Sequence, residues 1–388
     1  MKRQVDLEVF RRRYRRANRK GKGKLLTELC DLYGYNRKYL LQFFNYLTGK
    51  TYTRRGPKLK YKPTEELMEP LKRIWLASDQ LCSKRLKEAI PAWLRHYEES
   101  YGFLSEEVKE KLLTMSTGTL DHLLKPYRIR YKRRGLSGTK PGYLLKNQIP
   151  IKTDHWDVTK PGFMEADSVA HCGNSLAGEF VWSITLTDIL TCWTENRATW
   201  CKGEAGVVEQ IKDTEKSLPF ELLGFDCDNG GEFLNWHLMR YFSQDRKQKV
   251  QFTRSRPYRK NDNAHVEQKN WTHVRQLFGY DRFDNPALVR LMNDVYKNEW
   301  SQYQNYFMPT QKLLTKEKIN SKYRRKYEKA KTPYQRIIEC EHIAAKKKME
   351  LALIYEQLNP FTLKKIIEKK LRKIFQYVTV NKKPRTKI

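Results

Sequence analysis

Apolar residues recur at helical spacing near the start of the chain. Residues 24–47 carry two apolar stripes separated by Gly34, and their members are Leu25, Leu26, Leu29, Leu32, Tyr39, Leu40 and Phe43. Gly34 is typical of a helix end, and Asn36 is typical of the N-cap of the next helix. The pattern predicts two short helices joined by a tight turn, which is either a helix-turn-helix or an ordinary helical hairpin. The basic run at residues 11–24 favours DNA, with Asn36, Arg37 and Lys38 beginning the recognition helix.

A second helical unit is predicted over residues 64–126. It contains amphipathic stretches at residues 67–76, 84–97 and 106–113, and a last helix that Ser116 caps and that ends before Pro126. Its pattern is compatible with another helix-turn-helix. Two basic connectors flank this unit, at residues 50–62 and 128–140, and they carry Arg54, Arg55, Arg133 and Arg134. Short arginine-rich arms can enter the DNA minor groove. A plain flexible linker is an equally good interpretation of both.

The pattern changes from about residue 150. Strand-like stretches rich in Trp, Thr, Val and Ile lie at residues 163–169, 180–190, 192–200, 222–228 and 250–254. Helical stretches lie at residues 203–217, 231–242, 263–278 and 285–306. This order predicts an α/β sheet whose first strands are antiparallel and whose later strands are parallel. The segment after residue 310 reads as mostly helical, and residues 362–375 carry one apolar stripe with Lys and Arg opposite.

The charge distribution separates the same regions. The chain of 388 residues has a formal net charge of +33, which calls for a polyanionic partner. Residues 1–150 have a net charge of +20, residues 151–310 of −3, and residues 311–388 of +16. A near-neutral middle region between two basic flanks is expected if the flanks bind a nucleic-acid backbone and the middle performs chemistry with carboxylates.

Cysteine spacing and hydropathy exclude other classes. The seven cysteines form no C-x-x-C pair, so neither a zinc site nor a disulfide framework is predicted. The basic N-terminus lacks a following apolar segment, so no secretory signal is predicted. No run of about 18 apolar residues exists, which argues against a membrane span.

Three carboxylates in the middle region have the placement that a metal site requires. Asp167 lies within a predicted strand, Asp228 lies at the end of another, and Glu267 lies on a predicted helix. Magnesium prefers hard oxygen ligands, and two such ions can hold the attacking and leaving oxygens of a displacement at phosphorus. Each acid alone also has a structural explanation, as a turn, a surface strand residue or an exposed helix residue.

Segment 160–310 resembles the integrase-core catalytic domain of the retroviral-integrase superfamily, which has a ribonuclease H-like fold. Within that superfamily it is most similar to bacterial insertion-sequence transposases. The motifs that carry the resemblance are MEAD (164–167), DCDNGGEF (226–233) and RPYRKNDNAHVE (256–267). The resemblance implies a mixed five-stranded sheet and assigns Asp167, Asp228 and Glu267 as the catalytic, metal-binding acids.

The spacing of these acids departs from the family pattern. Family members commonly have 35 residues between the last two acids, and here 38 residues separate Asp228 from Glu267. Asp262 is the alternative third acid, because 33 residues separate it from Asp228. Glu267 is preferred because it is the glutamate of the Asp-Asn-Ala-x-x-Glu motif. Asp188 resembles the family's structural aspartate. Further candidate DNA contacts in this region are Arg259, Lys260, Asn263, Asn270 and Arg275.

The resemblance implies a DDE transposase that binds the ends of a mobile element, cleaves their 3′ ends and transfers them into target DNA. It implies two Mg²⁺ ions per site, with Mn²⁺ as a substitute, and double-stranded DNA as partner, both as terminal inverted repeats and as target. A homodimer or larger synaptic assembly follows, with no membrane and no nucleotide cofactor, in the cytoplasm at the nucleoid. The alternatives are a structure-selective nuclease of the same fold and a catalytically dead helix-turn-helix regulator.

The predicted organisation has five parts. A helix-turn-helix domain with a basic linker (1–62) precedes a second helical domain (63–127) and a basic linker (128–155). The α/β ribonuclease H-like domain occupies residues 156–310, and a basic, mostly helical region occupies residues 311–388.

Overall fold

The computed structural model describes residues 7–46, 61–131, 158–227, 233, 235–244, 246, 248–254, 264–319 and 322–379. The chain divides into two compact units, Met1–Lys62 and Pro63–Ile388. The finer division predicted at residues 127, 155 and 310 stays a prediction. The seven cysteines all lie in the described part of the chain, and all are free thiols.

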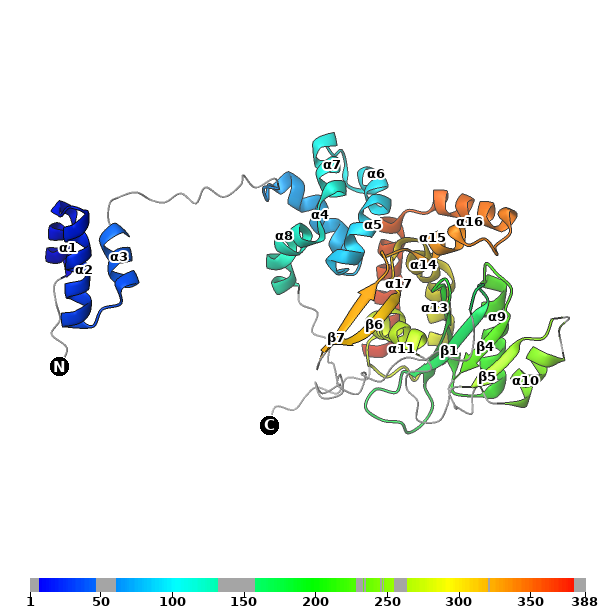
Figure 1. Ribbon diagram of the computed structural model, residues 1–388. Helices are drawn as coiled ribbons and strands as arrows, with labels where there is room; N and C mark the ends of the chain where they lie inside the picture. Colours follow the sequence, from blue (N-terminus) through cyan, green and yellow to red (C-terminus); the bar gives the residue numbers. More distant parts are fainter. Residues whose placement is uncertain are drawn as a thin grey trace. The chain divides into compact units, whose positions relative to one another are not determined.

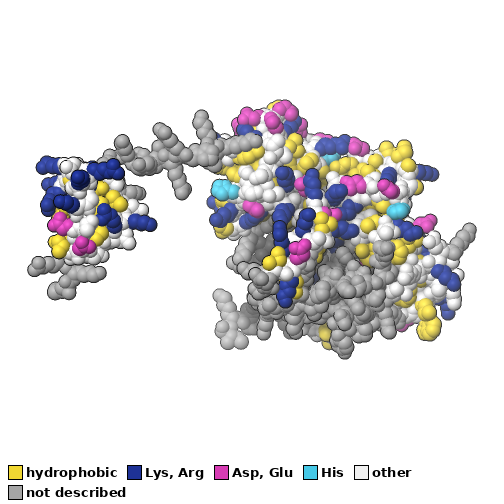
Figure 2. Space-filling view, in the orientation of Figure 1, with side chains coloured by type: hydrophobic (Ala, Val, Ile, Leu, Met, Phe, Trp, Pro, Cys, Tyr) yellow, Lys and Arg dark blue, Asp and Glu magenta, His cyan; other side chains and the backbone are white. Residues whose placement is uncertain are grey.

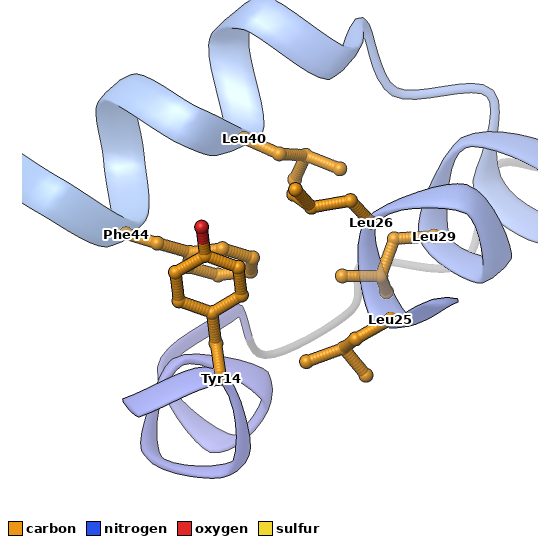
Figure 3. Close-up of a cluster of buried hydrophobic side chains, with 6 residues drawn as sticks. All are labelled: Tyr14, Leu25, Leu26, Leu29, Leu40 and Phe44. Carbon is orange, nitrogen blue, oxygen red and sulfur yellow. The ribbon is translucent and has the colours of Figure 1, made fainter. Parts of the chain in front are cut away.

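The first unit contains three helices, α1 (Leu7–Arg16), α2 (Arg19–Tyr33) and α3 (Arg37–Tyr46). Their apolar faces meet in one small core, which Figure 3 shows, made of Tyr14, Leu25, Leu26, Leu29, Leu40 and Phe44. Gly34 ends α2 in the left-handed region at φ 68°, and its N–H bonds to the carbonyl of Cys30. The two helices around Gly34 were predicted, and α1 completes the core by contributing Tyr14. Their function as a helix-turn-helix stays a prediction.

The second unit is built around a five-stranded sheet (Figure 1). Its strands are β1 (Phe163–Ala170), β2 (Val181–Asp188), β3 (Thr194–Trp200), β4 (Gly224–Cys227) and β5 (Gln251–Arg254), in the order β3-β2-β1-β4-β5. Strands β1, β2 and β3 pair antiparallel, whereas β4 runs parallel to both β1 and β5. This mixed sheet confirms the predicted one and agrees with a ribonuclease H-like core.

Helices cover the sheet. Two of them are single helices, α9 (Glu204–Ser217) and α10 (Trp236–Ser243). A third, continuous helix consists of α11 (Ala264–Lys269), η3 (Asn270–Arg275) and α12 (Gln276–Phe278). A fourth consists of α13 (Ala287–Asp294), η4 (Val295–Trp300) and α14 (Ser301–Phe307). Both η segments are π-helical turns within longer helices, a feature that often occurs at functional sites. Helix α9 packs on β3, and α11 packs on β1 and β2.

The helices that precede the sheet in sequence belong to the same compact unit. They are α4 (Glu65–Ala77), α5 (Ser83–Arg95), α6 (Tyr97–Tyr101), α7 (Glu106–Thr114) and α8 (Thr117–Arg130). The Tyr303 hydroxyl donates to the carbonyl of Ala77 at 2.6 Å, and the indole N–H of Trp93 donates to the carbonyl of Phe307 at 3.3 Å. These contacts join α4 and α5 to α14.

The segment after residue 310 differs from the sequence-based expectation. Helices α15 (Pro333–Glu339), α16 (Ala345–Gln357) and α17 (Pro360–Thr379) agree with a mostly helical region. Before them, however, β6 (Leu313–Ile319) and β7 (Lys322–Tyr327) form a two-stranded antiparallel hairpin that was not predicted. Among the described helices, none is long and apolar enough to cross a membrane.

Candidate active site

Asp167 lies on the central strand of the sheet. Along β1, Met164 and Ala166 point to a fully buried face, and Glu165 and Asp167 point to the other because strand side chains alternate. The Asp167 carboxylate is half-buried and accepts hydrogen bonds from the Ser168 backbone N–H at 2.7 Å and from the Asn270 side-chain amide at 2.6 Å. These bonds fix the orientation of the carboxylate.

Strand β4 leads the chain toward Asp167. It runs parallel to β1, and its last residue, Cys227, is the register partner of Ala166. Ala166 directly precedes Asp167 in the sequence, and Cys227 directly precedes Asp228. The two acids therefore each follow one member of the same register pair. Asp228 itself lies outside the described residues, as does its rival for the third position, Asp262. The carboxyl ends of parallel strands are where open α/β sheets place their ligands.

The continuous helix of α11 and η3 is attached to β1 at two points on either side of Glu267. At the first, the backbone N–H of Val266 donates to Glu165 Oε2 at 3.1 Å. At the second, Asn270 donates to Asp167. Glu267 lies between these two points in the chain, so its backbone lies alongside the part of β1 that carries Asp167. The side chain of Glu267 is outside the described atoms.

Asp188 has the structural role that the resemblance implied. It is fully buried at the end of β2 and accepts hydrogen bonds from the Gly162 N–H at 2.8 Å and from the Thr191 N–H and hydroxyl, both at 2.7 Å. Burial raises the pKa of this carboxyl. The three donors tie the start of β1 to the turn after β2, which fixes the strand that carries Asp167.

A buried lysine lies beside the candidate site, and the sequence did not single it out. Lys269 is only 6% exposed on α11. Burial, together with the nearby charges of Arg85 and Arg336, lowers the pKa of its ammonium group to about 8. The neighbouring His273 is also buried, and burial lowers its pKa well below the ordinary value.

The structure places five of the predicted DNA contacts. Asn36 accepts a hydrogen bond from the Lys38 N–H at 2.9 Å and so caps α3, and Arg37 donates to the Thr27 hydroxyl. Arg37 and Lys38 are exposed. Two others, both half-buried, make intramolecular contacts. The Asn270 side-chain amide donates to Asp167, and the Arg275 guanidinium lies 4.7 Å from the ring centre of Tyr280.

The remaining predicted contacts lie outside the described residues. They are Arg54, Arg55, Arg133, Arg134, Arg259, Lys260 and Asn263. Among the described residues, no group of three or more His, Cys, Asp or Glu side chains is arranged to hold a metal ion. Asp228 and the Glu267 side chain do not belong to that set. The donor chemistry of the three acids fits Mg²⁺ or Mn²⁺, because both prefer carboxylate oxygens.

Solved structures similar to this chain include three retroviral proteins. The first is the integrase catalytic core domain of HTLV-2 in complex with magnesium, which is 14% identical with a TM-score of 0.28 over 39% of this chain and 90% of that one. The second is the catalytic core domain of BIV integrase, which is 13% identical with a TM-score of 0.28 over 47% of this chain and 96% of that one. The third is a simian T-cell lymphotropic virus intasome in complex with the PP2A regulatory subunit B56 gamma, which is 13% identical with a TM-score of 0.34 over 66% of this chain and 75% of that one.

No family model matches the chain. A relative at the sequence level is the uncharacterized protein y4rM of Sinorhizobium fredii (strain NBRC 101917 / NGR234). The two are 35% identical over 337 residues, which make up 85% of this chain and 93% of the relative. Identity at this level over nearly the whole of both chains establishes common descent, and this chain belongs to the same family as y4rM.

Proposed function

We propose that this protein is a metal-dependent polynucleotidyl transferase, a DDE transposase that binds the ends of a mobile DNA element, cleaves them and joins them to target DNA. The observation that carries the proposal is the attachment of the continuous helix of α11 and η3 to β1. The Val266–Glu165 and Asn270–Asp167 hydrogen bonds hold the helix that carries Glu267 against the strand that carries Asp167. Strand β4, which leads to Asp228, is paired beside the same part of β1.

The chemistry of such a site follows from its residues. Divalent ions, when bound, supply a polarised phosphate and a water of lowered pKa. Asp167, Asp228 and Glu267 would hold them. Asn270 keeps the Asp167 carboxylate in one orientation through its 2.6 Å hydrogen bond, and Glu165 fixes the first turn of α11. In this scheme water attacks the phosphodiester first, and the freed 3′-hydroxyl attacks target DNA afterwards, so no side chain serves as nucleophile.

The charge pattern supports DNA as the partner. The net charge of +33 resides almost entirely in residues 1–150 and 311–388, on either side of the near-neutral catalytic segment. Cationic flanks bind phosphates and release counterions, so binding weakens steeply as salt is added. End recognition is assigned to the N-terminal helices, with Arg37 and Lys38 exposed at the start of α3. Joining two ends requires at least two subunits.

The test uses the full chain, Mg²⁺ and a labelled duplex that carries the inverted repeats flanking the gene. Wild-type protein is expected to yield nicked and strand-transfer products, and EDTA to abolish both. Asp228→Asn is expected to lower both by about 100-fold or more, because one metal ligand is lost, while duplex binding stays within a fewfold of wild type.

Three outcomes would contradict the proposal. Wild-type activity in Asp228→Asn would remove the second acid from the site. Binding by wild-type protein without cleavage would favour a catalytically dead regulator. Cleavage without any joined product would favour a structure-selective nuclease.

A further inference from the structure

The hairpin of β6 and β7 is an isolated two-stranded ribbon. Among the described residues, no other strand pairs with it, and Figure 1 shows it projecting from the body of its unit. Its described side chains are exposed along both strands, apart from the half-buried Tyr323. A lone two-stranded hairpin is marginally stable in water. This one therefore needs support from its base or from a partner.

The base of the ribbon is firmly held. Thr310 and Lys331 exchange backbone hydrogen bonds at 2.8 and 3.1 Å. The buried guanidinium of Arg336, on α15, donates to the Thr310 hydroxyl at 2.8 Å, to the Lys331 carbonyl at 2.9 Å and to the Thr310 carbonyl at 2.9 Å, and it also pairs with Glu328. Lys312 donates to the carbonyl of Leu190, in the turn after β2. These contacts anchor the base of the ribbon to α15 and to the turn after β2.

The ribbon is strongly cationic. Its two strands carry six Lys and Arg residues and one acid, Glu317. Residues directly opposite in an antiparallel pair share a face, so the register puts Lys316, Lys318, Tyr323 and Arg325 on one face, which has no acid. Glu317 lies on the other face opposite Arg324. Figure 2 shows Lys and Arg side chains gathered where Figure 1 draws this hairpin.

Two cationic residues occupy directly opposite register positions in the ribbon. Lys316 is the register partner of Arg325, and like charges directly opposite each other destabilise a strand pair. A bound polyanion would remove this repulsion. A second copy of the chain, added edge to edge, would instead bring another row of the same cations. The charge pattern therefore favours an anionic partner over a protein copy.

We propose that the β6–β7 hairpin is a DNA-binding arm that enters the major groove of double-stranded DNA. A two-stranded ribbon fits the width of this groove, whose walls are lined with phosphates. Arg324, Arg325 and Lys326 are exposed on β7 and alternate between its faces, so they can reach both walls. The inference rests on the proposed function in one respect, which is that DNA is the partner.

The experiment compares two triple variants of the full chain. The first is Arg324→Gln with Arg325→Gln and Lys326→Gln, on the arm. The matched control is Lys346→Gln with Lys369→Gln and Arg372→Gln, which removes the same charge from exposed positions of α16 and α17. Binding to a fluorescent duplex of arbitrary sequence is measured over a series of salt concentrations, with circular dichroism and thermal unfolding as folding checks.

The arm variant is expected to bind roughly 30-fold or more weakly at a given salt concentration, and its slope of log K against log salt is expected to fall by about 2 to 3. The control variant is expected to stay within a fewfold of wild type. Equal losses in both variants, or a larger loss in the control, would overturn the inference. So would an arm variant that binds DNA normally but changes its oligomeric state by light scattering.

Failure of the arm and failure of the proposed chemistry can be told apart. At saturating DNA, the arm variant is expected to retain Mg²⁺-dependent cleavage, because the arm carries none of the proposed metal ligands. If wild-type protein binds through the arm but never cleaves, the arm stands and the transferase proposal falls.

Discussion

Glu165 gives the sharpest test of how the site is held together. Its carboxylate is 1% exposed and accepts the backbone N–H of Val266 at 3.1 Å, one residue before Glu267. Glu165→Ala leaves that buried N–H without this acceptor, which costs about 1–3 kcal/mol. It also removes a carboxylate from the first turn of a helix, which costs about 0.3–1 kcal/mol.

A cost of about 2 kcal/mol corresponds to roughly a 30-fold loss in the population of the arrangement that aligns Glu267 with Asp167. The metal favours that arrangement, so excess metal restores it. We therefore expect Glu165→Ala to need roughly 30-fold more Mg²⁺ for half-maximal cleavage, with near-normal cleavage at saturation. Glu165→Gln keeps a side-chain oxygen as acceptor and is expected to shift the requirement only a fewfold.

The assay is a Mg²⁺ titration of duplex cleavage by wild-type protein and both variants. An unchanged Mg²⁺ requirement in Glu165→Ala would refute the positioning role. Absence of cleavage by Glu165→Gln at every Mg²⁺ concentration would also refute the positioning role, because it would indicate that Glu165 is itself a metal ligand.

Two further predictions concern stability. Burial and the charge of Arg275 lower the pKa of His171 to about 3, so between about pH 6.5 and 3 the unfolded chain binds a proton that the folded chain does not. The free energy of unfolding should therefore decrease as the pH is lowered through this window, by up to about 1.4 kcal/mol per pH unit. His171→Gln should reduce this slope in denaturant titrations at several pH values, and an unchanged slope would contradict the prediction. Arg197 is fully buried and pairs with Glu195 and Asp213. Arg197→Ala should lower the free energy of unfolding by about 3–5 kcal/mol, because Glu195 stays buried without it, and Arg197→Met with Glu195→Leu should recover most of the loss; a mild effect of the single change would refute this.

The sheet could be predicted because β2 and β3 are buried on both faces along nearly their whole length, which gives strand-like runs rich in Trp, Thr, Val and Ile in the sequence. The predicted stretches at residues 163–169 and 192–200 match β1 (Phe163–Ala170) and β3 (Thr194–Trp200) closely. The β6–β7 hairpin was missed because Leu, Lys and Glu, which fill much of β6, favour helices in isolation. Its strand form depends on pairing and on Arg336, which comes later in the chain.

The candidate site was predictable in part. The motif positions identified Asp167 as a candidate acid, and the structure places it on the central strand of the sheet. The hydrogen bond from Val266 to Glu165 joins residues 101 positions apart, and no local pattern carries that information. The role of Asn270 as a DNA contact stays a prediction, and its hydrogen bond to Asp167, 103 positions away, is also absent from any local pattern.

The most direct test of the central claim is anomalous diffraction from crystals of the protein soaked with Mn²⁺, with and without duplex DNA. The account predicts Mn²⁺ bound to the Asp167 carboxylate at about 2 Å, with Asp228 and Glu267 in the same coordination shell. Carboxylates that stay too far apart to share an ion, even on DNA, would contradict it.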